Sequence, residues 1–334
     1  MTIIIAILMF TFLVLIHELG HFLTAKKLGV RAYELAIGMG PKIFGKTYKD
    51  TEYTLRAIPF LAYVRFGDEE DSLFEDGDNF MNQSPIDRMK IIIMGPLVNI
   101  IAALLIMILV VFMTGFTVNQ IGELTPNMPA IEAGMKAGDT IVQIDKMPVE
   151  DWQDVVDTIT KHQTGPIEFV VKDKEDGAPR TLNVVPVEKE GRMVIGIAPA
   201  LEKDFGQSVV LGSKATLKMS TMMLDMIKQL FTGKADINEF SGPVGIVSIV
   251  NDVAKTGFVN VLYLTAMLSL NLGILNLLPI PALDGSKILI YGFEALTGKA
   301  MNRDLEMKIT LAGFAVLMAF TIFITYKDIL KFFA

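Results

Sequence analysis

The chain has 334 residues, of which 51% are hydrophobic, and its mean hydropathy is +0.47. These values are too high for an ordinary soluble protein and indicate a membrane protein. The formal net charge of −7 argues against nucleic acid as a partner. Because the sequence has no cysteine, disulfides are excluded, and any zinc ion must be bound by histidine and carboxylate side chains.

Residues 1–30 are predicted to form the first membrane helix. Residues 1–16 carry no charge, and the apolar run continues to Leu23. The segment has neither a basic amino-terminal region nor a small-residue cleavage site, which argues against a cleaved signal peptide. We therefore expect a retained helix that spans the membrane.

The sequence His-Glu-Leu-Gly-His stands at residues 17–21, near the end of this helix. Residues four apart share a helix face, so His17 and His21 can present imidazole nitrogens to one metal ion. Glu18 lies beside them, where it could accept a proton from water at the metal. The alternative is a pair of packing histidines beside a satisfied glutamate. However, Glu18 is the only charged residue before Lys26, and an ionisable group at membrane depth indicates a functional site.

Residues 31–66 are predicted to form β-strands rather than another helix. Apolar residues alternate at Tyr33, Leu35 and Ile37, and a second alternating stretch covers residues 51–56. Two interpretations stay open. The hairpin is either a simple connector between membrane helices or an edge that pairs with an extended peptide.

Residues 67–90 are predicted to contain an acidic loop and a short helix. The loop carries seven acids: Asp68, Glu69, Glu70, Asp71, Glu75, Asp76 and Asp78. Such a run of like charges favours a solvated loop over a cation site. The next uncharged run predicts a second membrane helix over residues 91–114.

Residues 117–200 are predicted to form a separate soluble module. A Gly-x-x-x-Gly-Asp turn at residues 134–139 leads into a strand, a helix capped by Asp151 and a further strand. This order resembles a PDZ domain, a fold that binds peptide ends by strand addition. His162 is the third histidine of the chain, and it is expected at the surface rather than at a metal.

The last third of the chain alternates an amphipathic helix with apolar runs. Apolar residues recur at helical spacing over residues 208–232, which fits a helix in the membrane interface, with packing against the preceding module as the alternative. Two further uncharged runs predict membrane helices at 257–293 and 307–327. The expected fold is thus a polytopic α-helical membrane protein with four transmembrane helices, a membrane-associated β-hairpin or sheet and one inserted α+β domain.

The third membrane segment contains polar residues that need partners. Asn271, Asn276 and Asp284 are the polar residues, and Pro279 and Pro281 interrupt the helix before the last of them. Irregular backbone at this depth is tolerated only where it faces protein or a wet cavity. Asp284 could therefore reach an interior site. The alternative is that it begins the cytoplasmic loop as a helix-end acid.

Basic residues predict the orientation. Lys26, Lys27 and Arg31 follow the first span, and Arg88 and Lys90 precede the second. By the positive-inside rule this loop is cytoplasmic, so the metal site lies near the cytoplasmic face and the PDZ-like module lies outside. The lysines close to the carboxyl terminus are a mild conflict.

Together the motifs resemble the site-2 protease family of intramembrane zinc metalloproteases, in particular its RseP-like bacterial branch with a single PDZ domain. The resemblance rests on the His-Glu-x-x-His sequence, Gly-Pro-Leu-x-Asn at residues 95–99, the PDZ-like insert, and Asn-x-x-Pro-x-Pro-x-Leu-Asp-Gly at residues 276–285. It implies a protease of the bacterial inner or cell membrane. Its expected substrates are single-pass membrane proteins, such as anti-sigma factors or signal-peptide remnants, cut in or near their transmembrane segments.

The resemblance also implies a metal centre. Zn²⁺ would be held by His17, His21 and Asp284, with Glu18 as the general base. A zinc ion with three protein ligands keeps a position open for water. A membrane binding or transport protein with a structural metal site is the rival hypothesis, but a structural site needs a fourth ligand, and we find no good candidate in the sequence.

Substrate contacts are implied as well. Asn276 is expected to hold substrate backbone, and Asn271 and Tyr63 are further candidates for substrate binding. The family often has Gly-Gly before this tyrosine, where the present chain has Leu61 and Ala62. The expected partners are single-pass transmembrane substrates, peptide or protein termini at the PDZ-like domain, and membrane lipid.

Overall fold

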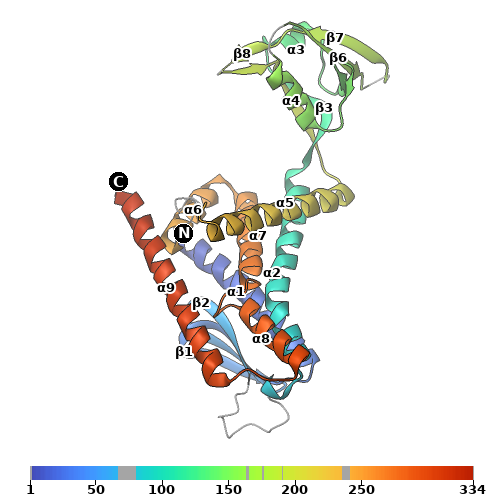
Figure 1. Ribbon diagram of the computed structural model, residues 1–334. Coiled ribbons are helices and arrows are strands. Elements are labelled where there is room, and N and C mark those ends of the chain that lie inside the picture. The colour runs from blue at the N-terminus through green and yellow to red at the C-terminus, as the bar shows by residue number, and fades with distance from the viewer. Residues whose placement is uncertain are drawn as a thin grey trace. The chain divides into compact units, whose positions relative to one another are not determined.

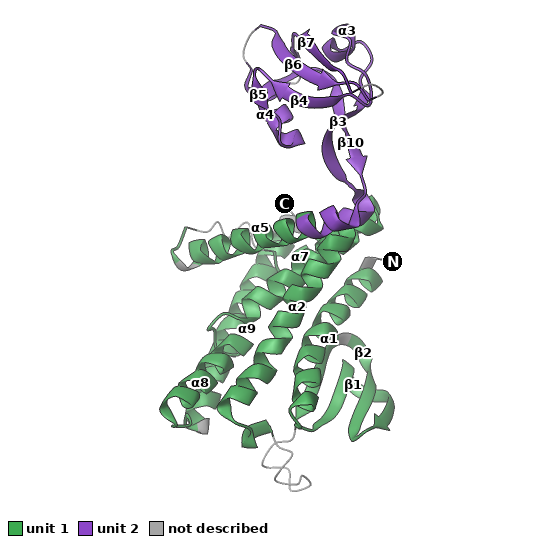
Figure 2. Ribbon diagram, turned by 90° about the vertical axis from the view of Figure 1, so that its right-hand side faces the viewer, with its two compact units in different colours: residues 1–110, 211–334 green, residues 111–210 purple. Residues whose placement is uncertain are grey.

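The computed structural model of the protein describes residues 2–66, 80–162, 165–174, 177–189, 191–234 and 241–333. The chain divides into two compact units, shown in Figure 2. Unit 1 comprises residues 1–110 and 211–334, and unit 2 comprises residues 111–210. The acidic run expected at residues 68–78 lies outside the described residues.

Unit 1 is built on helices that are long and apolar enough to cross a membrane. These are α1 (Thr2–Lys27), α2 (Pro85–Thr114), α7 (Phe258–Asn276) and α9 (Arg303–Phe333). Helices suit this environment because they pair their backbone polar groups internally. Leu8, Leu105 and Val316 are examples of the large apolar side chains that remain exposed on them, as expected for surfaces that face lipid. The predicted class of a four-span membrane protein is confirmed.

The third membrane segment is interrupted. The sequence predicts a third membrane segment over 257–293 with an interruption at Pro279 and Pro281. In the structure α7 ends at Asn276, and a separate helix, α8 (Asp284–Thr297), follows a turn. Two prolines and a positive φ of 76° at Ala282 make a continuous helix impossible there. A Cβ on Gly285 would overlap the carbonyl oxygen of Leu278, so only glycine permits this tight return. The turn therefore places Asp284 at the beginning of α8.

The region after α1 forms an antiparallel sheet from two long, bent strands, β1 (Ala32–Tyr48) and β2 (Thr51–Phe66). Residues 32–37 pair with 62–66 on one side and with 52–55 on the other, while 42–48 pair with 51–56. The two strands therefore act as four segments, in the spatial order 61–66, 32–37, 51–56 and 42–48. The segment 61–66 is one edge of this sheet, and it lies beside α1 (Figure 1).

Small residues bring the membrane helices close together. A Cβ on Gly20 of α1 would overlap the carbonyl oxygen of Met94 in α2, and one on Gly273 of α7 would lie 2.8 Å from the carbonyl oxygen of Pro96. Without a hydrophobic driving force inside lipid, such close packing is a main source of helix association. These glycines let α1 and α7 both approach α2 along the stretch that carries the Gly-Pro-Leu-x-Asn sequence.

The other helices of unit 1 pack around this core. They are η1 (Phe80–Asn82), α5 (Phe205–Phe231), whose first residues belong to unit 2, and α6 (Pro243–Thr256). Met219, Met223 and Ile227 of α5 pack against Ala103, Leu270 and Ile274. Other apolar residues of α5, such as Leu217, stay exposed. One stripe of the amphipathic helix thus packs on the membrane helices.

Unit 2 is an α+β domain. Its main sheet has the order β10-β3-β4-β6-β7, with β5 paired to β4, and a separate hairpin joins β8 and β9. The strands are β3 (Phe116–Leu124), β4 (Thr140–Ile144), β5 (Met147–Pro148), β6 (Ile167–Lys172), β7 (Pro179–Val184), β8 (Val187–Lys189), β9 (Arg192–Val194) and β10 (Ile197–Glu202). The helices are α3 (Pro129–Glu132) and α4 (Trp152–Lys161).

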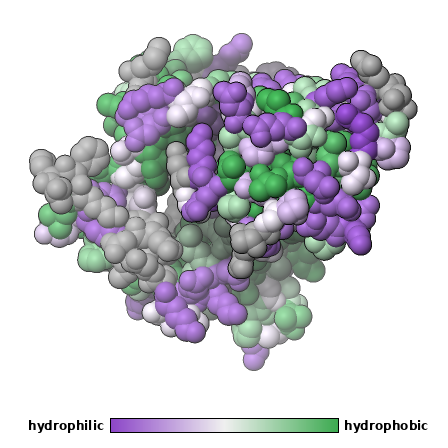
Figure 3. Space-filling view, turned by 90° about the horizontal axis from the view of Figure 1, so that it is seen from above, coloured by the Kyte–Doolittle hydropathy of each residue, from purple (hydrophilic) through white to green (hydrophobic). Residues whose placement is uncertain are grey.

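The core of unit 2 is apolar and its outside is polar. Ile121, Val155 and Phe169 are completely buried in this core. Asp151 caps α4 by accepting from the Asp154 amide, and the Asp154 side chain accepts from the Asp151 amide in return. Hydrophilic side chains dominate the surface nearest the viewer in Figure 3, around a small hydrophobic patch. This distribution is typical of a module that lies in water.

Candidate metal centre

The helical spacing of α1 brings its two histidines together at a buried position. Their Nε2 atoms are 3.2 Å apart, and the rings meet edge to face at an interplanar angle of 87°. His17 is 8% exposed and His21 is 7% exposed. The burial places both nitrogens out of contact with bulk solvent, where a shared cation would be bound strongly.

The turn between α7 and α8 adds a carboxylate to the pair. Oδ2 of Asp284 lies 3.1 Å from Nε2 of His17 and 3.6 Å from Nε2 of His21. Among the described residues, these three form the one group of side chains that could hold a metal ion. Asp284 is thus the first residue of α8, and its carboxylate lies beside the two histidines.

The cluster fits a zinc ion. Tetrahedral bonds of about 2.0–2.1 Å separate neighbouring ligand atoms by about 3.3–3.4 Å, and the three observed separations of 3.1, 3.2 and 3.6 Å lie around this value. Oδ2 of Asp284 is buried and has no hydrogen-bond partner within the described structure. A buried carboxylate oxygen without a partner is unfavourable unless a cation lies beside it.

The outer nitrogens of the histidines have their own partners. Nδ1 of His21 is 2.9 Å from the carbonyl oxygen of Ile91, so it carries the proton and donates, which leaves Nε2 as the acceptor for a metal. Nδ1 of His17 lies 3.3 Å from the side-chain amide of Asn99. Asn99 is fully buried, and its main-chain oxygen accepts from Oγ of Ser269 at 2.8 Å.

The orientation of the Asn99 amide follows from this chemistry. Nδ2 of the Asn99 amide faces Nδ1 of His17, and Oδ1 of the amide is buried without a partner. Rotating the amide by 180° directs Oδ1 to the Nδ1 proton of His17, which satisfies both groups. Asn99 belongs to the Gly-Pro-Leu-x-Asn sequence, which by itself assigns it no role. Its amide side chain inside the uncharged run of α2 is the sequence feature that indicates a functional role.

Gly95 makes room for the histidines on the same helix. A Cβ at this position would overlap the imidazole of His21 and would lie 3.0 Å from Cε1 of His17. Gly95 and Asn99 are four residues apart, so one face of α2 provides both the space and the hydrogen bond. The Gly-Pro-Leu-x-Asn sequence thus supports the metal centre from outside the ligand set.

Glu18 lies between the metal centre and the sheet. Its Oε2 accepts a hydrogen bond from the main-chain amide of Val64 at 3.1 Å. Val64 belongs to the edge segment 61–66. The carboxylate that the sequence proposes as a base is therefore fixed by the strand edge next to the metal ligands.

The candidate substrate residues lie around this centre in different settings. Asn276 is the last residue of α7, directly before the turn to Asp284, and Asn271 stands earlier on the same helix. The hydroxyl of Tyr63 donates to Oε2 of Glu34 at 3.0 Å, so it takes part in the sheet's own hydrogen bonding. His162 directly follows α4 in unit 2, and its Nε2 lies 3.1 Å from the carbonyl oxygen of Gly165.

Sequence reasoning missed a buried acid in the sheet. Glu34 is 5% exposed and accepts from Oγ1 of Thr54 at 2.6 Å, from Arg56 at 2.7 Å and from Tyr63 at 3.0 Å. Burial raises the pKa of this carboxyl, but the three donors outweigh burial and hold the pKa below its usual value. Because the donors come from two neighbouring segments, Glu34 ties the edge segment 61–66 to the rest of the sheet.

A second buried ion pair fixes α8. Arg88 of α2 donates to Oε1 of Glu294 at 2.7 Å, and its guanidinium lies 4.5 Å from the ring centroid of Tyr291. The helix that begins with Asp284 is therefore anchored at its other end to the helix that supports the histidines.

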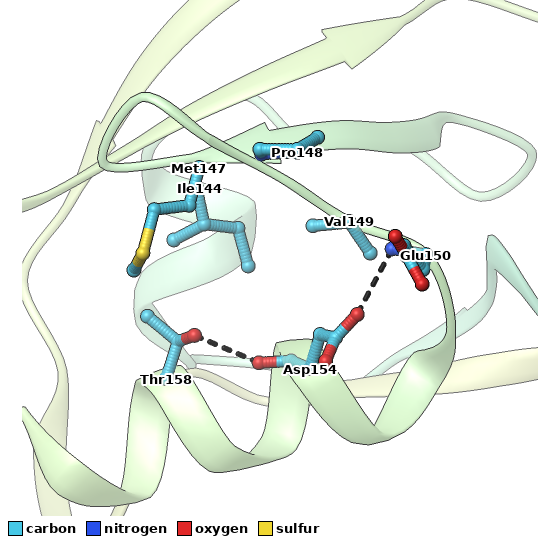
Figure 4. Close-up of a pocket in the computed structure, with 7 residues that line it drawn as sticks. All are labelled: Ile144, Met147, Pro148, Val149, Glu150, Asp154 and Thr158. Atoms are coloured by element: carbon cyan, nitrogen blue, oxygen red, sulfur yellow. Dashed lines mark hydrogen bonds between the residues drawn. The ribbon is translucent and has the colours of Figure 1, made fainter.

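Two cavities of unit 2 lie beside α4. The larger, of about 370 Å³, is lined by α4 residues such as Trp152 and Val156 and by residues 192–197, with Lys189 and Arg192 among its basic side chains. The smaller, of about 260 Å³, lies between β5 and α4 (Figure 4). Its carboxylate Asp154 is already engaged by the amide of Glu150. We therefore give the smaller cavity no role.

The site and the fold define a class of protein. Two histidines and an aspartate gather beside a glutamate within the membrane helices of a four-span protein. This is the arrangement of an intramembrane zinc metalloprotease. The profile of peptidase family M50 matches residues 5–320, and the chain belongs to this family.

Curated relatives agree with this assignment over nearly their whole length. A putative zinc metalloprotease of Clostridium acetobutylicum is 37% identical over 332 residues, covering 98% of this chain and 97% of the relative. The regulator of sigma-W protease RasP of Bacillus subtilis is 30% identical, covering 99% of both chains. The probable protease Eep of Enterococcus faecalis is 31% identical, also covering 99% of both chains.

Solved structures are similar to part of the chain. The PDZ domain of an SdrC-like protein from Listeria monocytogenes covers 25% of this chain and 90% of its own length, with 20% identity and a TM-score of 0.22. The PDZ domain of an SdrC-like protein from Listeria innocua covers 26% of this chain and 97% of its own length, with 24% identity and a TM-score of 0.22.

Proposed function

We propose that this metalloprotease hydrolyses peptide bonds in or near the transmembrane segments of single-pass membrane proteins. In this proposal His17, His21 and Asp284 hold the zinc ion, and Glu18 is the general base. The observation that carries the proposal is the cluster of three possible ligand atoms at separations of 3.1–3.6 Å, beside Glu18 and among the membrane helices. The cluster has three ligands among the described residues, as a catalytic zinc site requires, rather than the four of a structural site.

The chain's own groups perform the proton transfers. When bound, zinc polarises the peptide carbonyl and lowers the pKa of water to about 7. Glu18 accepts one proton as water adds to the carbonyl carbon, and it delivers that proton to the leaving nitrogen as the C–N bond breaks. The Val64 amide holds the Glu18 carboxylate during both steps, because it donates to Oε2.

The substrate must be extended when it reaches this site. A helical segment hides its carbonyls in its own hydrogen bonds, so it has to unwind, and its backbone then needs new partners inside the membrane. The edge segment 61–66 offers main-chain groups to a strand that adds beside it. We propose that Asn276 and Asn271 hold substrate backbone on the other side of the centre, and that Tyr63 contributes through the strand edge.

Unit 2 is proposed to select substrates. The cavity of about 370 Å³ beside α4 is apolar at Val155 and Ile159 and has Lys189 and Arg192 in its lining. An apolar groove with basic groups suits the end of a peptide or protein, whose carboxylate carries the opposite charge. With the basic loops of unit 1 in the cytoplasm, unit 2 lies outside and the metal centre lies near the cytoplasmic face of a bacterial cell membrane.

A cleavage assay tests the proposal. The purified full chain, reconstituted in lipid, should cut a model single-pass substrate, lose this activity with a chelator and regain it with added zinc. Glu18→Gln should keep the zinc and lose cleavage, because the ligands remain while the base is removed. Cleavage by Glu18→Gln at the wild-type rate would show that another group is the base. Zinc binding by a wild-type chain that cuts no single-pass substrate would favour the structural-site hypothesis.

A further inference from the structure

The contact between Glu18 and Val64 has consequences for how a substrate aligns. Val64 lies in the edge segment 61–66, which pairs with residues 32–37 and with no other strand in the part of the chain that the structure describes. Its amide donates to Glu18, so it faces away from that partner. Alternate residues of a strand direct their main-chain groups to the same edge, so the amide of Ala62 faces the same way. The outer edge of the sheet therefore lies beside Glu18 of α1.

The position of this amide is fixed by its neighbours. The Val64 side chain packs against the buried cluster of Phe22 in α1 and Ala32 and Leu35 in the adjoining segment. The preceding residue, Tyr63, is held by its hydrogen bond to Glu34. The edge is therefore anchored on both faces, and the Val64 amide cannot turn towards another acceptor without disturbing the sheet.

An amide that donates to Glu18 cannot also donate to a substrate carbonyl. A strand that adds to the edge can pair with Ala62, but the substrate carbonyl that faces Val64 finds the amide occupied. Among the substrate carbonyls that face the edge, this one therefore lacks its ladder partner. It also lies beside Glu18 and the metal ligands, where the proposed reaction takes place.

We propose that Val64 sets the cleavage register: the bond that is hydrolysed belongs to the substrate residue whose carbonyl faces Val64. This inference rests on the proposed function, and it names the main-chain group that selects the bond. Water adds to that carbonyl carbon, the C–N bond breaks, and Glu18 carries the proton from the water to the leaving nitrogen. Because Oε2 of Glu18 accepts from Val64, Oε1 is the oxygen that takes the proton.

Disulfide cross-linking measures the register directly, because the chain has no cysteine of its own. Arg65 is next to Val64, and its side chain is 53% exposed, so Arg65→Cys is a suitable probe. Side chains that lie opposite each other on neighbouring strands are close enough to cross-link with a small adjustment. The background is Glu18→Gln, which traps the substrate and still offers an oxygen to the Val64 amide.

A series of single-cysteine substrates is then oxidised with this variant, and mass spectrometry locates the bond that the wild type cuts. The expected maximum of cross-linking is at a residue adjacent to the one that supplies the scissile carbonyl. A maximum elsewhere on the substrate would overturn the register while leaving strand addition intact. Cleavage by the wild type without any cross-link would instead refute strand addition. Lys46→Cys, on the opposite edge segment 42–48, is the control and should cross-link to no substrate position.

Proline substitutions test the amide itself. Val64→Pro removes the N–H that holds Glu18, so kcat should fall at least tenfold while KM changes little. Ala62→Pro removes a neighbouring edge amide that serves binding alone, so it should raise KM more than it lowers kcat. Val64→Ala keeps the amide and should cut the same bond as the wild type. Cleavage by Val64→Pro at the same single bond and with the wild-type kcat would overturn the proposal.

Discussion

Asn99 offers a sharp test of how the metal centre is held. Asn99→Ala removes the partner of Nδ1 of His17 while leaving all three proposed ligands in place. Outer partners of ligating histidines typically contribute 10–100-fold to metal affinity or activity. The distance of 3.3 Å is longer than that of most N–H···O bonds, so we expect the lower end of this range. The predicted loss of zinc affinity is about tenfold, which corresponds to about 1.4 kcal/mol.

Competition with a chromogenic chelator measures this affinity, with substrate cleavage as a second readout. Ser269→Ala is the matched control, since it removes a buried hydrogen bond to the main chain of Asn99 but leaves the contact with His17. Asn99→Asp should retain or increase zinc affinity, because a carboxylate accepts the Nδ1 proton more strongly. Zinc affinity within twofold of wild type in Asn99→Ala would refute the role of this amide.

Further predictions concern the ligands, the space around them and the sheet. Asp284→Asn should lower zinc content and cleavage together. Glu294→Gln, on the same helix, should keep one zinc per chain but lower the free energy of unfolding by up to about 3 kcal/mol, because Arg88 loses its partner's charge. Metal analysis and thermal unfolding distinguish the two variants, and full zinc content in Asp284→Asn would contradict its assignment as a ligand. Gly95→Ala should abolish zinc binding, since its Cβ overlaps an imidazole, and a metal-loaded variant would contradict the packing. The pKa of Glu34 is lowered on folding, so its stabilisation should be complete above its unfolded pKa of about 4.3 and be lost as pH falls through the folded value. Unfolding curves at several pH values should therefore lose this dependence in Glu34→Gln.

The sequence by itself determined the features that depend on residues close together along the chain. The length of the uncharged runs fixed the four spans, because a bilayer requires about 20 apolar residues per helix. The i, i+4 spacing of His17 and His21 predicted a shared face, because helix geometry is local. The break before Asp284 also followed from local chemistry, since Pro279 and Pro281 cannot continue a helix.

The tertiary structure decided which distant groups meet. The contact of Asn99 with His17 and that of Val64 with Glu18 each join residues from different elements, and no local pattern specifies them. The crossing of α1 and α2 at Gly20 and Gly95 sets these contacts through backbone packing. Likewise, the pattern of two strands gave no sign that bends would turn them into four paired segments with an edge beside the metal centre. Contacts between distant elements depend on how the surfaces of both elements fit together in space, and the residue pattern within either element alone does not determine that fit.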